Sequence, residues 1–113
     1  WELYSKFLAN VNGVVLPGFD SGNGECPQWV DAIIEDRDGV GEFLKSKGIM
    51  IRNFWRPNHH QAPYRSFDSD FPVSTWASKR AIWLPSAISL CDGDIEYVAN
   101  HIRDYFHNAK LAA

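Results

Sequence analysis

The sequence predicts an α/β (α+β) fold: a small sandwich of a three- to four-stranded, largely antiparallel sheet with helices packed mainly on one face. Two observations lead to this expectation. Short β-branched runs alternate with longer stretches of helical periodicity, which places strands and helices in one layered unit. The chain has 113 residues, 45% of them hydrophobic and 14% aromatic, enough for one core of ordinary domain size. We therefore expect residues 1–113 to form a single domain.

The first element is an amphipathic helix over residues 1–10. Large apolar side chains recur there at helical spacing, at Trp1, Leu3, Tyr4, Phe7 and Leu8. Asn12-Gly13 interrupts the pattern, and a short strand follows over residues 14–16. Residues 17–27 are rich in glycine and small polar residues, so they are predicted to form a loop.

A strand, a helix and a second strand are expected next. Residues 29–34 are apolar and β-branched, which predicts a strand. Asp36 or Asp38 can cap a helix over residues 38–47, which Gly48 ends in a left-handed conformation. Residues 49–55 alternate and are β-rich, so we expect a strand across all seven.

The last third of the chain predicts a helix, a strand and a long helix. Pro72 suits a first helical turn, and that helix extends to about Arg80. Residues 81–84 form a strand that Pro85 stops. Asp92 opens the final helix, whose apolar stripe consists of Ile95, Val98, Ala99, Ile102, Tyr105 and Phe106.

Charge and hydropathy exclude several classes of protein. The net charge is −3 and the basic residues are scattered, so the sequence lacks the basic patch of a nucleic-acid binder. No apolar run reaches the roughly 20 residues that a membrane helix requires. We expect a cytoplasmic protein with no nucleic-acid or membrane partner. Cys26 and Cys91 are expected to be free thiols that behave as small buried hydrophobes.

Several short motifs follow one another in a defined order. They are Gly48-Ile49, Trp55-Arg56-Pro57-Asn58-His59-His60-Gln61-Ala62-Pro63-Tyr64, Phe71-Pro72-Val73-Ser74, Trp83-Leu84-Pro85-Ser86 and Asp92-Gly93-Asp94-Ile95-Glu96-Tyr97-Val98. Taken together, the sequence resembles the C-terminal small domain of the DegT-type nucleotide-sugar aminotransferases over nearly its whole length. The resemblance implies a pyridoxal phosphate (PLP) enzyme in which a separate large domain holds the cofactor through a Schiff-base lysine.

The cofactor machinery implied by this resemblance has no counterpart in the sequence. A Schiff-base lysine needs a desolvated pocket that lowers its pKa. The five lysines fall mostly on predicted polar helix faces, at Lys6, Lys45, Lys47, Lys79 and Lys110. We therefore expect no catalytic residue and no bound PLP in this chain alone.

The segment from Trp55 to Tyr64 is the candidate substrate-binding site, because a loop that follows a strand is aimed by a rigid element. Its candidate residues are Trp55, Arg56, His59, His60 and Tyr64. Arg56 can pair with a phosphate oxygen, and either aromatic ring can stack on a base or sugar. By resemblance, His59 occupies the family's Pro-x-His position near the substrate. Asn58 stands where the family often has leucine, and ordinary loop histidines remain the alternative.

Other chemistry finds less support in the sequence. No cysteine or zinc-protease motif completes a metal-ligand set around the paired histidines, so no metal is expected. His101 and His107 are expected on the surface of the last helix. No serine has the sequence context of a nucleophile.

Three functions remain open at this point. The first is a non-catalytic aminotransferase-like C-terminal domain, either stand-alone or a fragment, that binds a nucleotide sugar or a partner protein. The second is one half of a split PLP-dependent sugar aminotransferase, and the third is a purely structural oligomerising module. A face that normally packs on a large domain would be left open and favour association. We therefore expect a homo-oligomer, with the aromatic N-terminal helix as its contact.

Overall fold

The computed structural model describes residues 1–111, except for the side chains of residues 109 and 110. The helices and strands in chain order are α1 (Glu2–Leu8), β1 (Val14–Val15), β2 (Val30–Ile34), α2 (Arg37–Ser46), β3 (Arg52–Asn53), α3 (Pro72–Ser78), β4 (Ala81–Leu84) and α4 (Asp92–Leu111). The order confirms the small α+β fold expected from the sequence, with four strands in the sheet.

The sheet has the strand order β1-β2-β4-β3, and each neighbouring pair is antiparallel. The last strand in the chain, β4, therefore lies inside the sheet between β2 and β3, and all four of its residues are buried. Its register on β2 places Trp83 opposite Asp31 and Ile82 opposite Ala32. The strand that the sequence orders last thus connects the two halves of the sheet.

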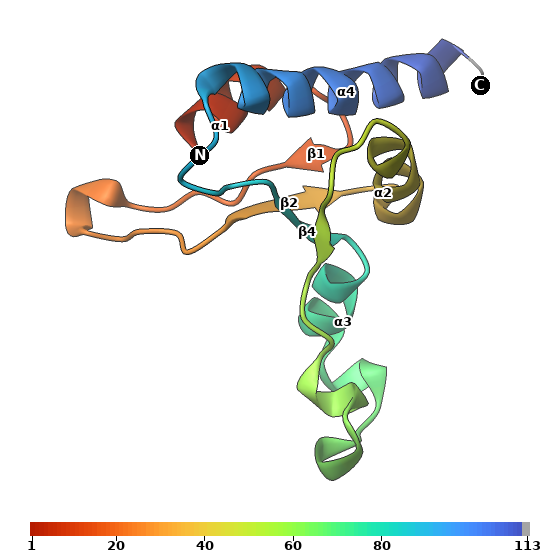
Figure 1. The fold of residues 1–113 in the computed structure, drawn as a ribbon. Coiled ribbons are helices and arrows are strands. Elements are labelled where there is room, and N and C mark those ends of the chain that lie inside the picture. Colours follow the sequence, from red (N-terminus) through yellow and green to blue (C-terminus); the bar gives the residue numbers. More distant parts are fainter. Residues whose placement is uncertain (112–113) are drawn as a thin grey trace.

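Helices α1, α2 and α4 lie over one face of the sheet (Figure 1). On that face β2 contributes Ala32 and Ile34, and β4 contributes Ile82, all with no exposed surface. The helices add Tyr4, Leu8, Val40, Leu44, Val98, Ala99 and Ile102 to the same core. The predicted apolar stripe of α4 is confirmed by this packing, because burying such a stripe is what stabilises an amphipathic helix.

The limits of α2 follow from local backbone chemistry. The Asp36 carboxylate accepts a hydrogen bond from the Gly39 amide at 3.3 Å, and so caps the first turn. Gly48 ends the helix with φ of +75°, a left-handed conformation that glycine adopts at little cost. Both predicted signals are confirmed. The Tyr105 hydroxyl also donates to Asp36, which links α4 to the start of α2 and raises the pKa of Tyr105 to about 12.

The strand expected over residues 49–55 is shorter than predicted, because only Arg52–Asn53 pair as β3. Ile49, the first residue of the predicted strand, still belongs to the C-terminal end of α2, since its amide donates to the Leu44 carbonyl. At its other end the chain leaves the sheet after Phe54, whose amide donates to Ala81. An alternating sequence does not show which backbone amides will form hydrogen bonds in a helix cap or a loop instead of in the sheet.

Residues 54–80, which we call the arm, extend away from the sheet between β3 and β4 (Figure 1, green to teal). The arm contains three short 3₁₀ turns and ends in α3. Pro72 occupies the first turn of α3, as predicted. The turns are Asn58–His60, Ala62–Tyr64 and Asp68–Asp70.

The expectation that both cysteines are buried is wrong, since Cys26 and Cys91 are exposed free thiols. Cys26 lies in the predicted loop before β2. Cys91 precedes α4, and its amide donates to the Asp94 carboxylate at 2.9 Å, which holds it at the surface.

Within residues 1–111, none of the helices combines the length and the hydropathy that a membrane-spanning segment requires.

Candidate functional site

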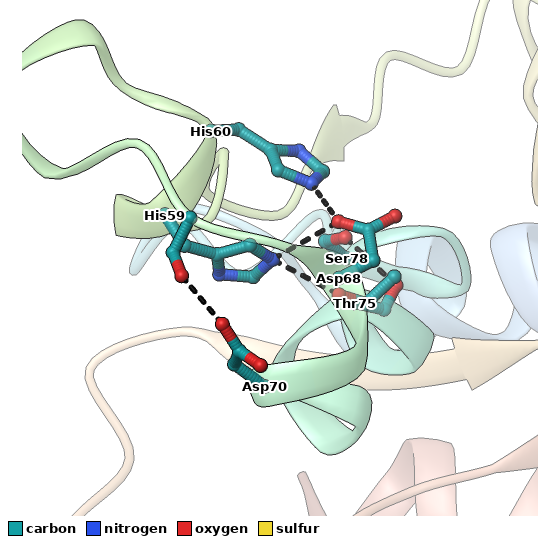
Figure 2. A network of polar contacts seen from close by, with 7 residues as sticks. His59, His60, Asp68, Asp70, Thr75 and Ser78 are labelled. Atoms are coloured by element: carbon teal, nitrogen blue, oxygen red, sulfur yellow. Dashed lines mark hydrogen bonds and ion pairs between the residues drawn. The ribbon is translucent and has the colours of Figure 1, made fainter.

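His59 is the most enclosed side chain of the arm and is 4% exposed. Its ring stacks on Phe71 with the ring centroids 4.9 Å apart. Its Nε2 atom lies 3.0 Å from the Thr75 hydroxyl and 3.2 Å from an Asp68 carboxylate oxygen (Figure 2). The His59 imidazole therefore links its own turn, Asn58–His60, to the Asp68–Asp70 turn and to α3.

His60 reaches the same carboxylate from the solvent side. Its Nε2 lies 2.5 Å from the Asp68 oxygen that His59 also contacts (Figure 2). The hydrogen bond from His60 is the main reason why the pKa of Asp68 lies below its ordinary value. An ionised carboxylate only accepts hydrogen bonds, so the imidazole N–H groups donate to it. The His60 side chain keeps 31% of its surface exposed.

His59, His60 and Asp68 are also groups of the kind that bind transition metals. Their ligand atoms lie within 4.8 Å of one another. Sequence reasoning missed Asp68 because it lies eight residues beyond His60 in no recognised ligand spacing. The same three side chains already satisfy one another by hydrogen bonds, so this network needs no ion to hold its geometry.

Arg56 and Trp55 lie in a different part of the arm. They line a shallow groove of about 270 Å³ together with Phe54, Pro57, Asn58, Val73, Ser74 and Ala77. Among the described residues Arg56 forms no ion pair, so its guanidinium is free to meet an anionic group. Neither histidine lines this groove, and Tyr64 is exposed in a separate turn. The structure therefore divides the five predicted residues among three places.

Three tryptophans gather on the sheet face opposite the helices, and we call this set the tryptophan face: Trp29, Trp55 and Trp83. Trp83 is 6% exposed, whereas Trp29 and Trp55 are 37% and 62% exposed. Ring centroids are 4.6 Å apart between Trp29 and Trp83 and 4.9 Å apart between Trp55 and Trp83. Trp29 was not a sequence candidate, because only the register of β2 on β4 brings it to Trp83.

A hollow of about 800 Å³ adjoins the tryptophan face. Its lining includes Trp29, Arg52, Trp83 and Ile88. This volume falls in the range of small-molecule sites. The hollow combines aromatic walls with one exposed guanidinium, and it lies on the sheet face that no helix of the core covers.

This fold, with helices on one face of the sheet and an arm before β4, also occurs in solved structures of longer proteins. A DegT/DnrJ/EryC1/StrS aminotransferase from Brucella abortus superposes with a TM-score of 0.82 at 26% identity, over 93% of this chain and 29% of its own. DesI, solved in the presence of its TDP-sugar product, superposes with a TM-score of 0.78 at 28% identity, over the same shares.

The family model of the DegT/DnrJ/EryC1/StrS aminotransferases matches residues 1–103, so the chain belongs to this family. A GDP-perosamine synthase from Vibrio cholerae is 36% identical over an alignment of 115 positions, which covers 94% of this chain. The chain spans about 30% of the length of that relative. The family resemblance expected from the sequence motifs is thereby confirmed.

Proposed function

We propose that this chain is the small, non-catalytic domain of a PLP-dependent nucleotide-sugar aminotransferase and acts by completing the active site of a cofactor-binding part. The observation that carries the proposal is the match of nearly the whole chain to 30% of a GDP-perosamine synthase. The cofactor-binding part lies in the same polypeptide or in a separate one, which includes the split aminotransferase considered above.

The lysines of the chain do not fit the PLP group of the family. Lys6, Lys45, Lys47 and Lys79 are exposed, and the side chain of Lys110 lies outside the described residues. A Schiff-base lysine must be desolvated to react, and these four side chains are open to water. We therefore assign no chemical step to this chain and expect the cofactor to be held elsewhere.

The contribution of this chain is to bind and position the substrate. Arg56 offers a charge-assisted hydrogen bond to a phosphate oxygen, and Trp55 beside it offers a ring for stacking. His59 is buried within the arm, so its role in substrate binding stays a prediction. We propose that it acts as a positioning residue, while His60 and Arg56 face the substrate.

A hybrid enzyme tests this function. The aligned 30% of the Vibrio cholerae synthase is replaced by this chain, and synthesis of GDP-perosamine is measured. We expect the hybrid to be active, the chain alone to be inactive, and Arg56→Ala in the hybrid to raise the KM about 10-fold or more, the typical loss of a hydrogen bond to a charged group. Arg103→Ala, an exposed arginine on α4, is the matched control.

Two results would contradict the proposal. One is amine transfer by the chain alone, because the chemistry would then lie within these residues. The other is a hybrid that folds and retains the absorbance of bound PLP yet makes no product. If Arg56→Ala changes neither KM nor kcat, the structural module becomes the better reading.

A further inference from the structure

One carboxylate oxygen on the sheet face opposite the helices lacks a hydrogen-bond partner. Asp31 lies in the middle of β2, opposite Trp83 of β4. Among residues 1–111, with the exclusions stated above, Asp31 Oδ1 is the buried side-chain polar atom without a hydrogen bond. Its strand neighbours Val30 and Ala32 point to the helix side and are buried in the core, so Asp31 points to the tryptophan face.

An unpaired carboxylate oxygen is costly to shield from water, because no hydrogen bond replaces its hydration. Burial raises the pKa of Asp31, and the indole N–H of Trp83, which lies near the carboxylate but forms no hydrogen bond of ordinary geometry with Oδ1, partly opposes this rise. Arg52 of β3 pairs with Trp83 from the other neighbouring strand of β4. It therefore lies two strand spacings, or about 10 Å, from Asp31, and Arg52 and Asp31 form no ion pair. The domain itself therefore does not satisfy this oxygen.

The surroundings of Asp31 have the character of an interface. Trp29 and Trp55 remain substantially exposed around the buried Trp83, and exposed aromatic side chains of this kind are enriched where proteins bind one another. Further large apolar side chains are exposed along the arm, at Tyr64, Phe67, Phe71, Val73 and Trp76. The helices of the core already cover the other sheet face.

The relatives indicate what covers this face. Their chains are more than three times as long as the segment they share with this one, since the shared segment is 29% or 30% of each. We infer that the tryptophan face docks on the cofactor-binding part of the aminotransferase, and that this partner donates a hydrogen bond to Asp31 from a cationic side chain or a backbone amide. The inference rests on the proposed function.

The carboxylate can meet such a donor without a change of backbone. Asp31 as a whole is partly exposed, and rotation of its carboxylate about χ2 exchanges the two oxygens, a torsion that is broad for aspartate. A donor at the open side then pairs with whichever oxygen faces it. A hydrogen bond that involves a charged group contributes about 1.5–3 kcal/mol, or roughly 10- to 150-fold in affinity.

The test titrates this chain with the Vibrio cholerae synthase from which the aligned 30% has been removed. Tryptophan emission reports docking, because covering Trp29 and Trp55 shifts it to shorter wavelength. We expect Asp31→Asn to weaken the complex about 10-fold or more while raising the Tm of the free chain. Asp104→Asn, at an exposed carboxylate on α4, is expected to change neither value. Trp29→Ala is expected to weaken docking without touching the carboxylate.

Each outcome decides between the two claims. No binding by the wild-type chain would overturn the proposed function and this inference with it. Tight binding that Asp31→Asn and Trp29→Ala leave unchanged would overturn the inference alone, because the partner would then dock elsewhere. Weaker binding by both variants, with a higher Tm for free Asp31→Asn, would support it.

Discussion

At the scale of single residues, the arm depends on one buried imidazole. His59 stacks on Phe71 and contacts both Thr75 and Asp68. Sequence reasoning identified His59 as a candidate because of its motif, but it could not show that the ring is enclosed. The partners that enclose it lie 9 to 16 residues further along the chain, beyond the reach of local pattern. A candidate ligand residue thus becomes one that shapes the arm.

Replacement of His59 by alanine is expected to destabilise the protein. The variant loses the ring packing and leaves the Thr75 hydroxyl without this partner, so we expect a loss of about 2–4 kcal/mol in the free energy of unfolding. Urea denaturation followed by tryptophan fluorescence measures it. His107→Ala, at an exposed position on α4, is the control and should change stability by less than about 0.5 kcal/mol. Equal losses in both variants would count against the role of His59.

Asp68 makes the arm sensitive to acid. The hydrogen bond from His60 lowers the pKa of Asp68 in the folded protein. Its contribution to stability is therefore present above the unfolded pKa and is lost as the pH falls through the folded value. We expect the Tm of the wild type to decline more between pH 5 and pH 2 than that of Asp68→Asn, because asparagine does not titrate. Parallel Tm profiles for the two proteins would contradict this assignment.

At the scale of elements, the sequence predicted most helices and strands because each has its own local signal. The apolar stripe of α4, the Asp36 cap and the glycine after α2 all act within a few residues. The length of β3 was not predictable in this way, since the backbone groups of Ile49 and Phe54 are taken by Leu44 and Ala81. Strand order was not predictable either, because the central position of β4 depends on pairing across about 50 residues.

The end of α2 gives a prediction at this scale. Gly48 has φ of +75°, and a Cβ there would meet no atom within 4 Å. Replacement by alanine is therefore costly only through the backbone conformation, and we expect a loss of about 1 kcal/mol in the free energy of unfolding. Gly18 also has open space but no positive φ, so Gly18→Ala should be neutral or slightly stabilising in the same urea titration. The reverse ranking would show that another factor dominates at Gly48.

At the scale of the whole molecule, helices cover one face of the sheet, whereas the opposite face exposes large apolar side chains. The sequence predicted that copies of the chain would contact one another through the aromatic N-terminal helix. In the structure, Tyr4 and Leu8 of α1 are buried in the core of their own chain, so we now expect that contact on another surface. The large exposed apolar side chains lie instead on the tryptophan face and along the arm. Any association of the free chain should therefore use that side.

Self-association of the free chain follows from the same open surface, because apolar area exposed to water is stabilised by contact with another copy. We expect sedimentation equilibrium to show a mass that rises with concentration. Exchange of both exposed indoles, Trp29→Ser with Trp55→Ser, should shift the chain toward monomer, whereas Val15→Ser, an exposed apolar residue at the β1 edge of the sheet, should not. Adding the truncated synthase should compete with self-association, since both partners need the tryptophan face. A wild-type chain that stays monomeric over a wide concentration range would contradict the predicted self-association through the tryptophan face.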